Sequence, residues 1–235
     1  MELQQRIDQT DWALVTESMN AKGYSSIPGI LSADECDALV AHYGDEAGYR
    51  KTIVMENHGY GLGQYKYYSY PLPSVVQELR EKVYPHIAPI ANKWMEVLGI
   101  DKQFPHVLSE LTTLCHEAGQ LRPTPLILKY NKGGYNALHQ DLYGEVYFPM
   151  QLVVCLNEPG KDFEGGEFVL VEQRPRMQSK AMVLNPKKGD VLLFTTNFRP
   201  VMGSKGYYRV NMRHGVSEVT NGNRHTLGII FHDAT

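Results

Sequence analysis

The stretch Pro186-Lys-Lys-Gly-Asp-Val-Leu-Leu-Phe194 decides the fold class, because turn-forming residues lead directly into a short apolar run. A short apolar run bounded by turn residues is typical of a buried strand. The pattern recurs on both sides of this stretch. The segments expected as strands are Thr124–Tyr130, Val146–Leu156, Gly166–Glu172, Ala181–Leu184, Asp190–Thr195, Tyr207–His214 and Arg224–His232.

Turn sequences separate these segments at short intervals. They are Lys132-Gly-Gly, Glu158-Pro-Gly, Asn185-Pro-Lys-Lys-Gly and Asn221-Gly-Asn. Short strands at such a spacing favour two facing antiparallel sheets, as in a jelly roll or open barrel. We therefore expect a mainly β protein, a double-stranded β-helix (jelly-roll) core packed against N-terminal helices.

The first half of the chain is expected to be mainly helical. Ser32-Ala-Asp-Glu35 is a capping box that begins a helix, and Pro85 and Pro89 interrupt a longer helical pattern because proline is costly inside a helix. Between the helical stretches, Gly59–Pro73 contains glycines, prolines and tyrosines and predicts a loop or short hairpin, either ordinary packing or a lid over a substrate. The expected helices are Asp11–Lys22, the one that follows Ser32, Pro73–Tyr84, Ile87–Leu98 and about His106–Ala118.

The length of 235 residues suits one domain (residues 1–235), with a mostly helical elaboration over 1–120 and the jelly-roll core over 121–235. No internal repeat or low-complexity run divides it. Three cysteines without metal-site spacing suit reduced thiols, and no apolar run is long enough for a bilayer. We expect a cytoplasmic protein without a membrane partner; the sequence leaves its oligomeric state open.

Charge is uneven along the chain, although the net charge is only -3. Residues 171–213 hold nine basic and two acidic side chains, which makes this segment +7 and the remainder -10. The basic residues either lie on solvated faces or meet an anionic partner such as nucleic acid. Arg174 and Arg176, with Tyr65 and Tyr67 of the tyrosine-rich segment, are the candidate substrate contacts.

His139-Gln-Asp141 is the first candidate for chemistry. Residues two apart on an extended segment point to one face, so the imidazole and the carboxylate could bind one ion. His214 ends a later expected strand. Two imidazoles and one carboxylate leave metal positions open, as in non-haem iron oxygenases. A His-X-Asp pair alone also arises by chance, as a surface hydrogen-bond pair.

Arg224-His-Thr226 is the second candidate, because Arg224 and Thr226 share one face of a strand. A guanidinium matches a carboxylate with two parallel hydrogen bonds, so Arg224 suits the far end of a dicarboxylate that chelates a metal. Tyr130 lies on the face of its strand that carries Leu126 and Leu128, where it either donates to the same carboxylate or packs in the core.

These motifs together resemble the 2-oxoglutarate/iron(II)-dependent dioxygenase superfamily. The matching residues are Tyr130-Asn-Lys-Gly-Gly-Tyr135, His139-Gln-Asp141, Gly165-Gly166, and His214 followed ten residues later by Arg224. The layout is similar to that of prolyl hydroxylases and alkylation-repair demethylases. The stretches Leu138–Gly144, Gly166–Ser179 and Arg213–Gly215 resemble more closely a bacterial group of oxygenases that act on damaged DNA.

The resemblance implies that His139, Asp141 and His214 bind Fe(II), and that Tyr130, Arg224 and Thr226 hold 2-oxoglutarate, with O2 as the other co-substrate. Collagen-type prolyl hydroxylases usually carry lysine at the position of Arg224. Repair demethylases usually show further arginines beyond it, where Gly228 and Ile230 stand here. The motif therefore leaves the substrate open.

The expected reaction is oxidative decarboxylation of 2-oxoglutarate coupled to substrate hydroxylation, including oxidative demethylation and DNA repair if the substrate is a methylated base. Hydroxylation of a peptide side chain or of a small metabolite is the alternative. A zinc hydrolase and a non-catalytic binding jelly roll are the other classes, and neither gives a reason for pairing Arg224 with Thr226.

Overall fold

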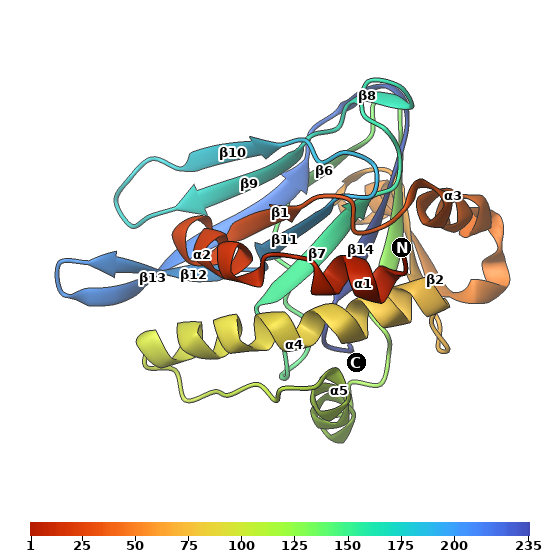
Figure 1. Cartoon of the computed structure of the whole chain (residues 1–235). Helices are drawn as coiled ribbons and strands as arrows, with labels where there is room; N and C mark the ends of the chain where they lie inside the picture. Colours follow the sequence, from red (N-terminus) through yellow and green to blue (C-terminus); the bar gives the residue numbers. More distant parts are fainter.

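The computed structural model describes residues 1–235 and consists of two antiparallel sheets that face each other, with helices outside them (Figure 1). The larger sheet has eight strands in the order β1-β11-β7-β14-β5-β4-β2, with β8 paired to β14. The smaller sheet has six strands in the order β10-β9-β13-β6-β3, with β12 paired to β13. This mainly β jelly roll with N-terminal helices is the expected fold class.

The strands of the C-terminal half follow the expected segments closely, because turn residues end each of them. The expectation omitted β1 to β4, β6, β8 and β12. The strands are β1 (Tyr24–Ile27), β2 (Tyr49–Val54), β3 (Gly61–Leu62), β4 (Gln64–Tyr68), β5 (Leu126–Asn131), β6 (Tyr135–His139), β7 (Met150–Cys155), β8 (Phe163–Gly165), β9 (Phe168–Gln173), β10 (Lys180–Leu184), β11 (Val191–Thr195), β12 (Phe198–Gly203), β13 (Gly206–Val216) and β14 (Val219–Ile230).

Five α-helices and three short 3-10 helices lie in the first 120 residues. No helix has both the length and the apolar character needed to cross a membrane. The helices are α1 (Leu3–Asp8), α2 (Trp12–Lys22), α3 (Ala33–Ala41), α4 (Ser74–Val97), α5 (Leu108–Glu117), η1 (His42–Gly44), η2 (Glu46–Gly48) and η3 (Met55–His58).

The prediction of two helices separated by Pro85 and Pro89 was wrong, because α4 runs unbroken through both prolines. The two prolines are four residues apart and both are exposed. The carbonyl groups that lose a hydrogen-bond partner to proline are therefore on the solvent side, where water can satisfy them. The opposite side of α4 is buried along its whole length, from Val76 to Met95, and this packing offsets the cost.

The tyrosine-rich segment was predicted as a loop or short hairpin, and its middle part, Gly61–Leu62 and Gln64–Tyr68, is strand. β4 pairs with β2 on one side and with β5 on the other, so Tyr65 and Tyr67 belong to the larger sheet. Alternation along β4 points both side chains to the inner face. A strand bonded on both sides is not a mobile lid, and the N-terminal 120 residues contribute strands to both sheets.

Alternation divides the larger sheet into a face that packs on the helices and a face that lines the interior of the jelly roll. Ile127 of β5, Leu152 of β7 and Leu227 of β14 join the main apolar core with the helices. Figure 1 shows α4 running across this side of the sheet, with α1 and α2 beside it. The neighbours of these residues on each strand, such as Gln151 and Thr226, therefore face inward.

Ser32 caps α3 as expected, since its side chain accepts a hydrogen bond from the Glu35 amide and the Glu35 side chain accepts one from the Ser32 amide. Replacing Ser32 by alanine is expected to lower the free energy of unfolding by about 1 kcal/mol, because a helix amide loses its acceptor. Urea denaturation measures the change. An unchanged denaturation midpoint would contradict this role of Ser32.

Candidate functional site

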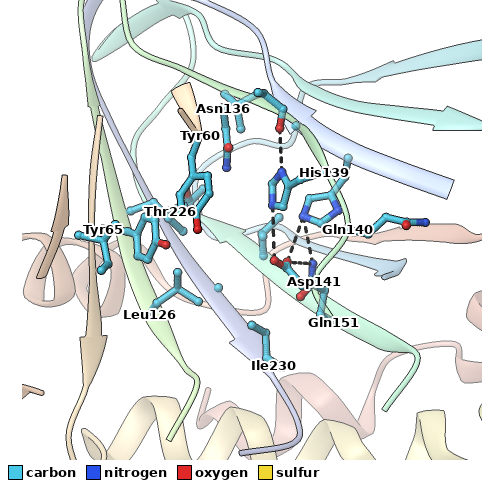
Figure 2. A pocket seen from close by; sticks show the side chains of 18 of the residues that line it. Tyr60, Tyr65, Leu126, Asn136, His139, Gln140, Asp141, Gln151, Thr226 and Ile230 are labelled. Carbon is cyan, nitrogen blue, oxygen red and sulfur yellow. Dashed lines mark hydrogen bonds and ion pairs between the residues drawn. The ribbon is translucent and has the colours of Figure 1, made fainter. Parts of the chain in front are cut away.

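His139, Asp141 and His214 converge from distant parts of the sequence. His139 ends β6, Asp141 lies two residues after it, and His214 is on β13. β6 and β13 pair with His139 opposite His214, and the Asp141 carboxylate lies beside both rings. Nε2 of His139 is 3.5 Å from Oδ1 of Asp141, and Nε2 of His214 is 3.3 Å from Oδ2. One ligand atom from each residue lies within 4.8 Å of the others, so the three could hold one metal ion (Figure 2).

Hydrogen bonds and packing orient the two imidazoles. Nδ1 of His139 donates to the carbonyl oxygen of Ala137 at 2.8 Å, which leaves the Nε2 lone pair toward Asp141. The His214 ring packs against the rings of Phe168 and Phe194. Burial lowers the pKa of His214 and so favours the neutral imidazole that a metal requires.

Asp141 is ionised at this site. Burial by itself raises the pKa of this carboxyl group, but its interactions with the rings of His214 and His139 and the hydrogen bond from Gln151 outweigh it. The pKa of Asp141 is therefore held well below its usual value. A set of two neutral imidazoles and one carboxylate fits iron(II) with open positions for other ligands.

Arg224 is a buried cation without an anionic partner. It is 1% exposed, and its only side-chain hydrogen bond runs from Nη1 to Oγ1 of Thr226 at 3.2 Å. Nε of Arg224 is buried with no acceptor, and none of the ion pairs in the structure includes this residue. An unpaired buried charge is costly, so this guanidinium fits the carboxylate of a bound acid.

Tyr130 stands beside Arg224 with a hydroxyl that is able to donate. Its register partner across β5 and β14 is Arg224, and the guanidinium lies 5.7 Å from the centre of its ring. The hydroxyl accepts from Nδ2 of Asn136 at 3.3 Å, so its own hydrogen is free. Burial raises the pKa of Tyr130 to about 12, which keeps the phenol protonated near neutral pH.

A cavity of about 600 Å³ joins these groups. The three candidate metal ligands, Tyr130, Arg224, Thr226, Tyr65 and Tyr67 all line it. Apart from the metal-ligand candidates and Arg224, its only basic side chains are Lys51 and His58, and it has no further acidic one. Figure 2 shows Tyr60 and Tyr65 on the side of the cavity opposite His139 and Asp141.

Arg174 and Arg176 do not line the cavity. Nε of Arg174 donates to Glu172, which also pairs with the buried Arg199. Arg176 lies exposed between β9 and β10 in the left-handed region, with φ of 62°. Part of the basic segment of the sequence is therefore neutralised inside the protein, whereas Arg209 and Arg213 of β13 remain exposed.

The sequence prediction missed four polar residues around the site: Asn136, Gln140, Tyr143 and Gln151. Gln140 points away from the cavity (Figure 2) and donates to the carbonyl oxygens of Asn197 and Met212, which ties the segment after β6 to β13. Of these four, only Gln151 could have been found from the sequence, because it is the one polar residue in the apolar run Met150–Cys155.

The family model of Oxygenase-NA, described as an oxygenase catalysing oxidative methylation of damaged DNA, matches residues 63–234. The chain belongs to the Oxygenase-NA family. A curated relative, the uncharacterised protein Rv2227 of Mycobacterium tuberculosis (strain H37Rv), is 46% identical over 164 residues, which is 70% of each chain. The expectation of an oxygenase is thereby confirmed.

Solved structures share the fold of this Oxygenase-NA protein at low sequence identity. A Pseudomonas putida prolyl-4-hydroxylase has a TM-score of 0.58 and 14% identity, with 94% of this chain and 98% of the other covered. An oxidoreductase of the 2OG-Fe(II) oxygenase family from Burkholderia pseudomallei has a TM-score of 0.55 and 14% identity, with 97% and 94% covered. The fold is that of the iron(II)- and 2-oxoglutarate-dependent oxygenases, in agreement with the cofactors expected from the sequence.

Proposed function

We propose that His139, Asp141 and His214 bind the iron(II) and that Arg224, Thr226 and Tyr130 bind the distal carboxylate of 2-oxoglutarate. The observation that carries this proposal is the buried, unpaired guanidinium of Arg224 in the same cavity as the three ligands. When bound, iron(II) and 2-oxoglutarate supply the oxidising chemistry, in which O2 is consumed, succinate and CO2 are formed, and a substrate position is hydroxylated.

The residues of the chain bind and orient 2-oxoglutarate and exclude water from the site. Arg224 and the Thr226 and Tyr130 hydroxyls together offer hydrogen bonds to one carboxylate, which fixes the direction of the diacid. Phe168 and Phe194 cover the buried side of His214 and keep water from its ring. The rest of the cavity, which Tyr60, Tyr65 and Tyr67 line, would be left for substrate and O2.

The substrate that we propose is a methylated base in nucleic acid. The family description names damaged DNA. A base taken out of its stack needs a pocket that offers rings for stacking and neutral hydrogen-bonding groups, and the hydroxyls and rings of Tyr60, Tyr65 and Tyr67 line this cavity. The exposed Arg209 and Arg213 and the Lys51 side chain at the cavity could contact the phosphate backbone.

Methylated and unmethylated oligonucleotides of one sequence test this substrate. The wild-type protein with iron(II), 2-oxoglutarate and O2 should release formaldehyde and succinate in equal amounts from the methylated strand alone, because hydroxylation of an N-methyl group frees it as formaldehyde. Binding should weaken steeply as salt rises. Succinate formation without loss of the methyl group, together with salt-independent behaviour, would contradict the nucleic-acid substrate, and a mass shift of 16 in a peptide or metabolite from extract would identify the alternative.

We also propose that residues 1–235 form one domain and that the protein is cytoplasmic. Strands from the first 120 residues complete both sheets, and the three cysteines are all free and buried. Limited proteolysis tests the first point. A single protected core that keeps β2 and β4 together with β14 is expected, whereas a stable fragment that begins near residue 121 would contradict it.

A further inference from the structure

Both oxygens of the Asp141 carboxylate accept a hydrogen bond from a neutral side chain. The hydroxyl of Tyr143 donates to Oδ1 at 2.9 Å, and Nε2 of Gln151 donates to Oδ2 at 2.8 Å. Figure 2 shows Gln151 directly beside Asp141 at the end of the cavity opposite Tyr65. Neither donor is one of the residues that bind iron or 2-oxoglutarate in the function proposed above.

The two donors come from different parts of the fold. Tyr143 is two residues after Asp141 in the segment that follows β6 of the smaller sheet, whereas Gln151 lies on β7 of the larger sheet. All three candidate metal ligands lie on strands of the smaller sheet or in the segment that follows β6. Gln151 therefore links the carboxylate to the opposite sheet.

The positions of the donors fix the rotation of the carboxylate about its Cβ–Cγ bond. Oδ1 faces His139 and Oδ2 faces His214, at the distances given above. The carboxylate is planar and rotates as one unit, so each hydrogen bond resists rotation about the Cβ–Cγ bond, and bonds to both oxygens resist it more strongly than either one alone. Two neutral donors also leave its negative charge uncompensated, whereas a lysine or arginine in their place would compete with a cation.

Gln151 has no evident role in packing. It is 4% exposed, and the remaining residues of β7 are apolar. A buried amide costs free energy unless it is hydrogen bonded, and an apolar residue of similar size would avoid that cost. The Gln151 amide nitrogen makes its contacts to Asp141 and, at 3.2 Å, to Nε2 of His214, both at the candidate metal site.

We propose that Tyr143 and Gln151 are positioning residues of the metal site, which together hold the Asp141 carboxylate in the rotation that allows it and both histidines to bind one ion. The proposal rests on the function proposed above, since it takes His139, Asp141 and His214 as the ligands. Loss of either donor lowers metal affinity without altering the pocket for the distal carboxylate of 2-oxoglutarate.

The test measures binding of Mn(II) to the full-length protein by electron paramagnetic resonance, without O2 or 2-oxoglutarate. The variants are Tyr143→Phe, Gln151→Met and the double variant, with Tyr135→Phe on β6 and Gln173→Met on β9 as matched controls outside this contact. Each single variant is expected to raise the Mn(II) dissociation constant by about 10-fold, the lower end of the cost of losing a partner of a metal ligand. The controls should stay within about twofold of wild type, a change under 0.5 kcal/mol.

A second readout separates positioning from general damage to the fold. At saturating Mn(II), the dissociation constant of 2-oxoglutarate should be the same in the single variants and in wild type. Mn(II) affinity within twofold of wild type in both variants would overturn the proposal. Weaker Mn(II) binding in only one variant would overturn the claim that both residues hold the carboxylate. If Gln151→Met does not fold, Tyr143→Phe decides, because Tyr143 is only partly buried. His139→Ala checks the ligand set itself: if it keeps Mn(II) affinity, the proposed function fails, not the positioning role alone.

Discussion

Replacing His214 by alanine is expected to abolish conversion of 2-oxoglutarate to succinate in the presence of the methylated substrate. The ring supplies one of only three side chains that could hold the metal, and His214 is 6% exposed, so water cannot easily take its place with the same geometry. We expect metal affinity to fall by more than about 100-fold, beyond the cost of losing an outer hydrogen-bond partner.

The measurement is the metal content of purified protein together with succinate formation. His106→Ala is the matched control, because His106 is exposed and lies outside the cavity. It should keep both metal and activity. A His214→Ala protein that retains wild-type metal content and turnover would remove His214 from the site.

Replacing Arg224 by methionine is expected to weaken 2-oxoglutarate binding by about 30- to 4,000-fold. Removing one partner of a buried charge pair costs about 2–5 kcal/mol, and about 1.4 kcal/mol corresponds to a tenfold change in affinity. Arg224→Lys should recover only part of the loss, because lysine keeps the charge but not the two parallel hydrogen bonds. Isothermal titration under nitrogen with the metal-loaded protein measures both changes.

For the protein without ligands, we expect that Arg224→Met does not reduce stability. Because Arg224 is buried and unpaired there, its removal should leave the free energy of unfolding unchanged or raise it. Urea denaturation of the metal-free protein checks this. A large loss of stability in Arg224→Met would mean that the guanidinium is needed for packing against Tyr130 and Phe163, and that it is not kept for an acid ligand.

Local patterns predicted seven of the ten strands of the C-terminal half, because turn residues bound these strands and their sequences alternate or are continuously apolar. The inward direction of Arg224 and Thr226 follows from that alternation alone. The unbroken α4 was not predictable from a rule that counts proline as a break, since the outcome depends on which side of the helix meets water. The pairing of β4 between β2 and β5 depends on partners far apart in sequence.

The candidate site divides in the same way. His139, Asp141 and His214 were predictable because metal ligands must be particular residue types, and Arg224 because a diacid needs a buried cation. Tyr143 and Gln151 act through hydrogen bonds to Asp141 that no spacing rule encodes. Arg174 was chosen from its charge, whereas in the structure its side chain forms an ion pair with Glu172 and does not line the cavity.

Anaerobic titration of the protein with iron(II) and 2-oxoglutarate tests the central claim most directly, since the chelate of the two absorbs weakly in the visible range. We expect the band to appear only when both are present and to saturate at one iron per chain. It should be lost in Asp141→Ala and should require far more 2-oxoglutarate in Arg224→Met. A wild-type protein that shows no band at saturating concentrations, or a band that survives removal of Asp141, would contradict the account.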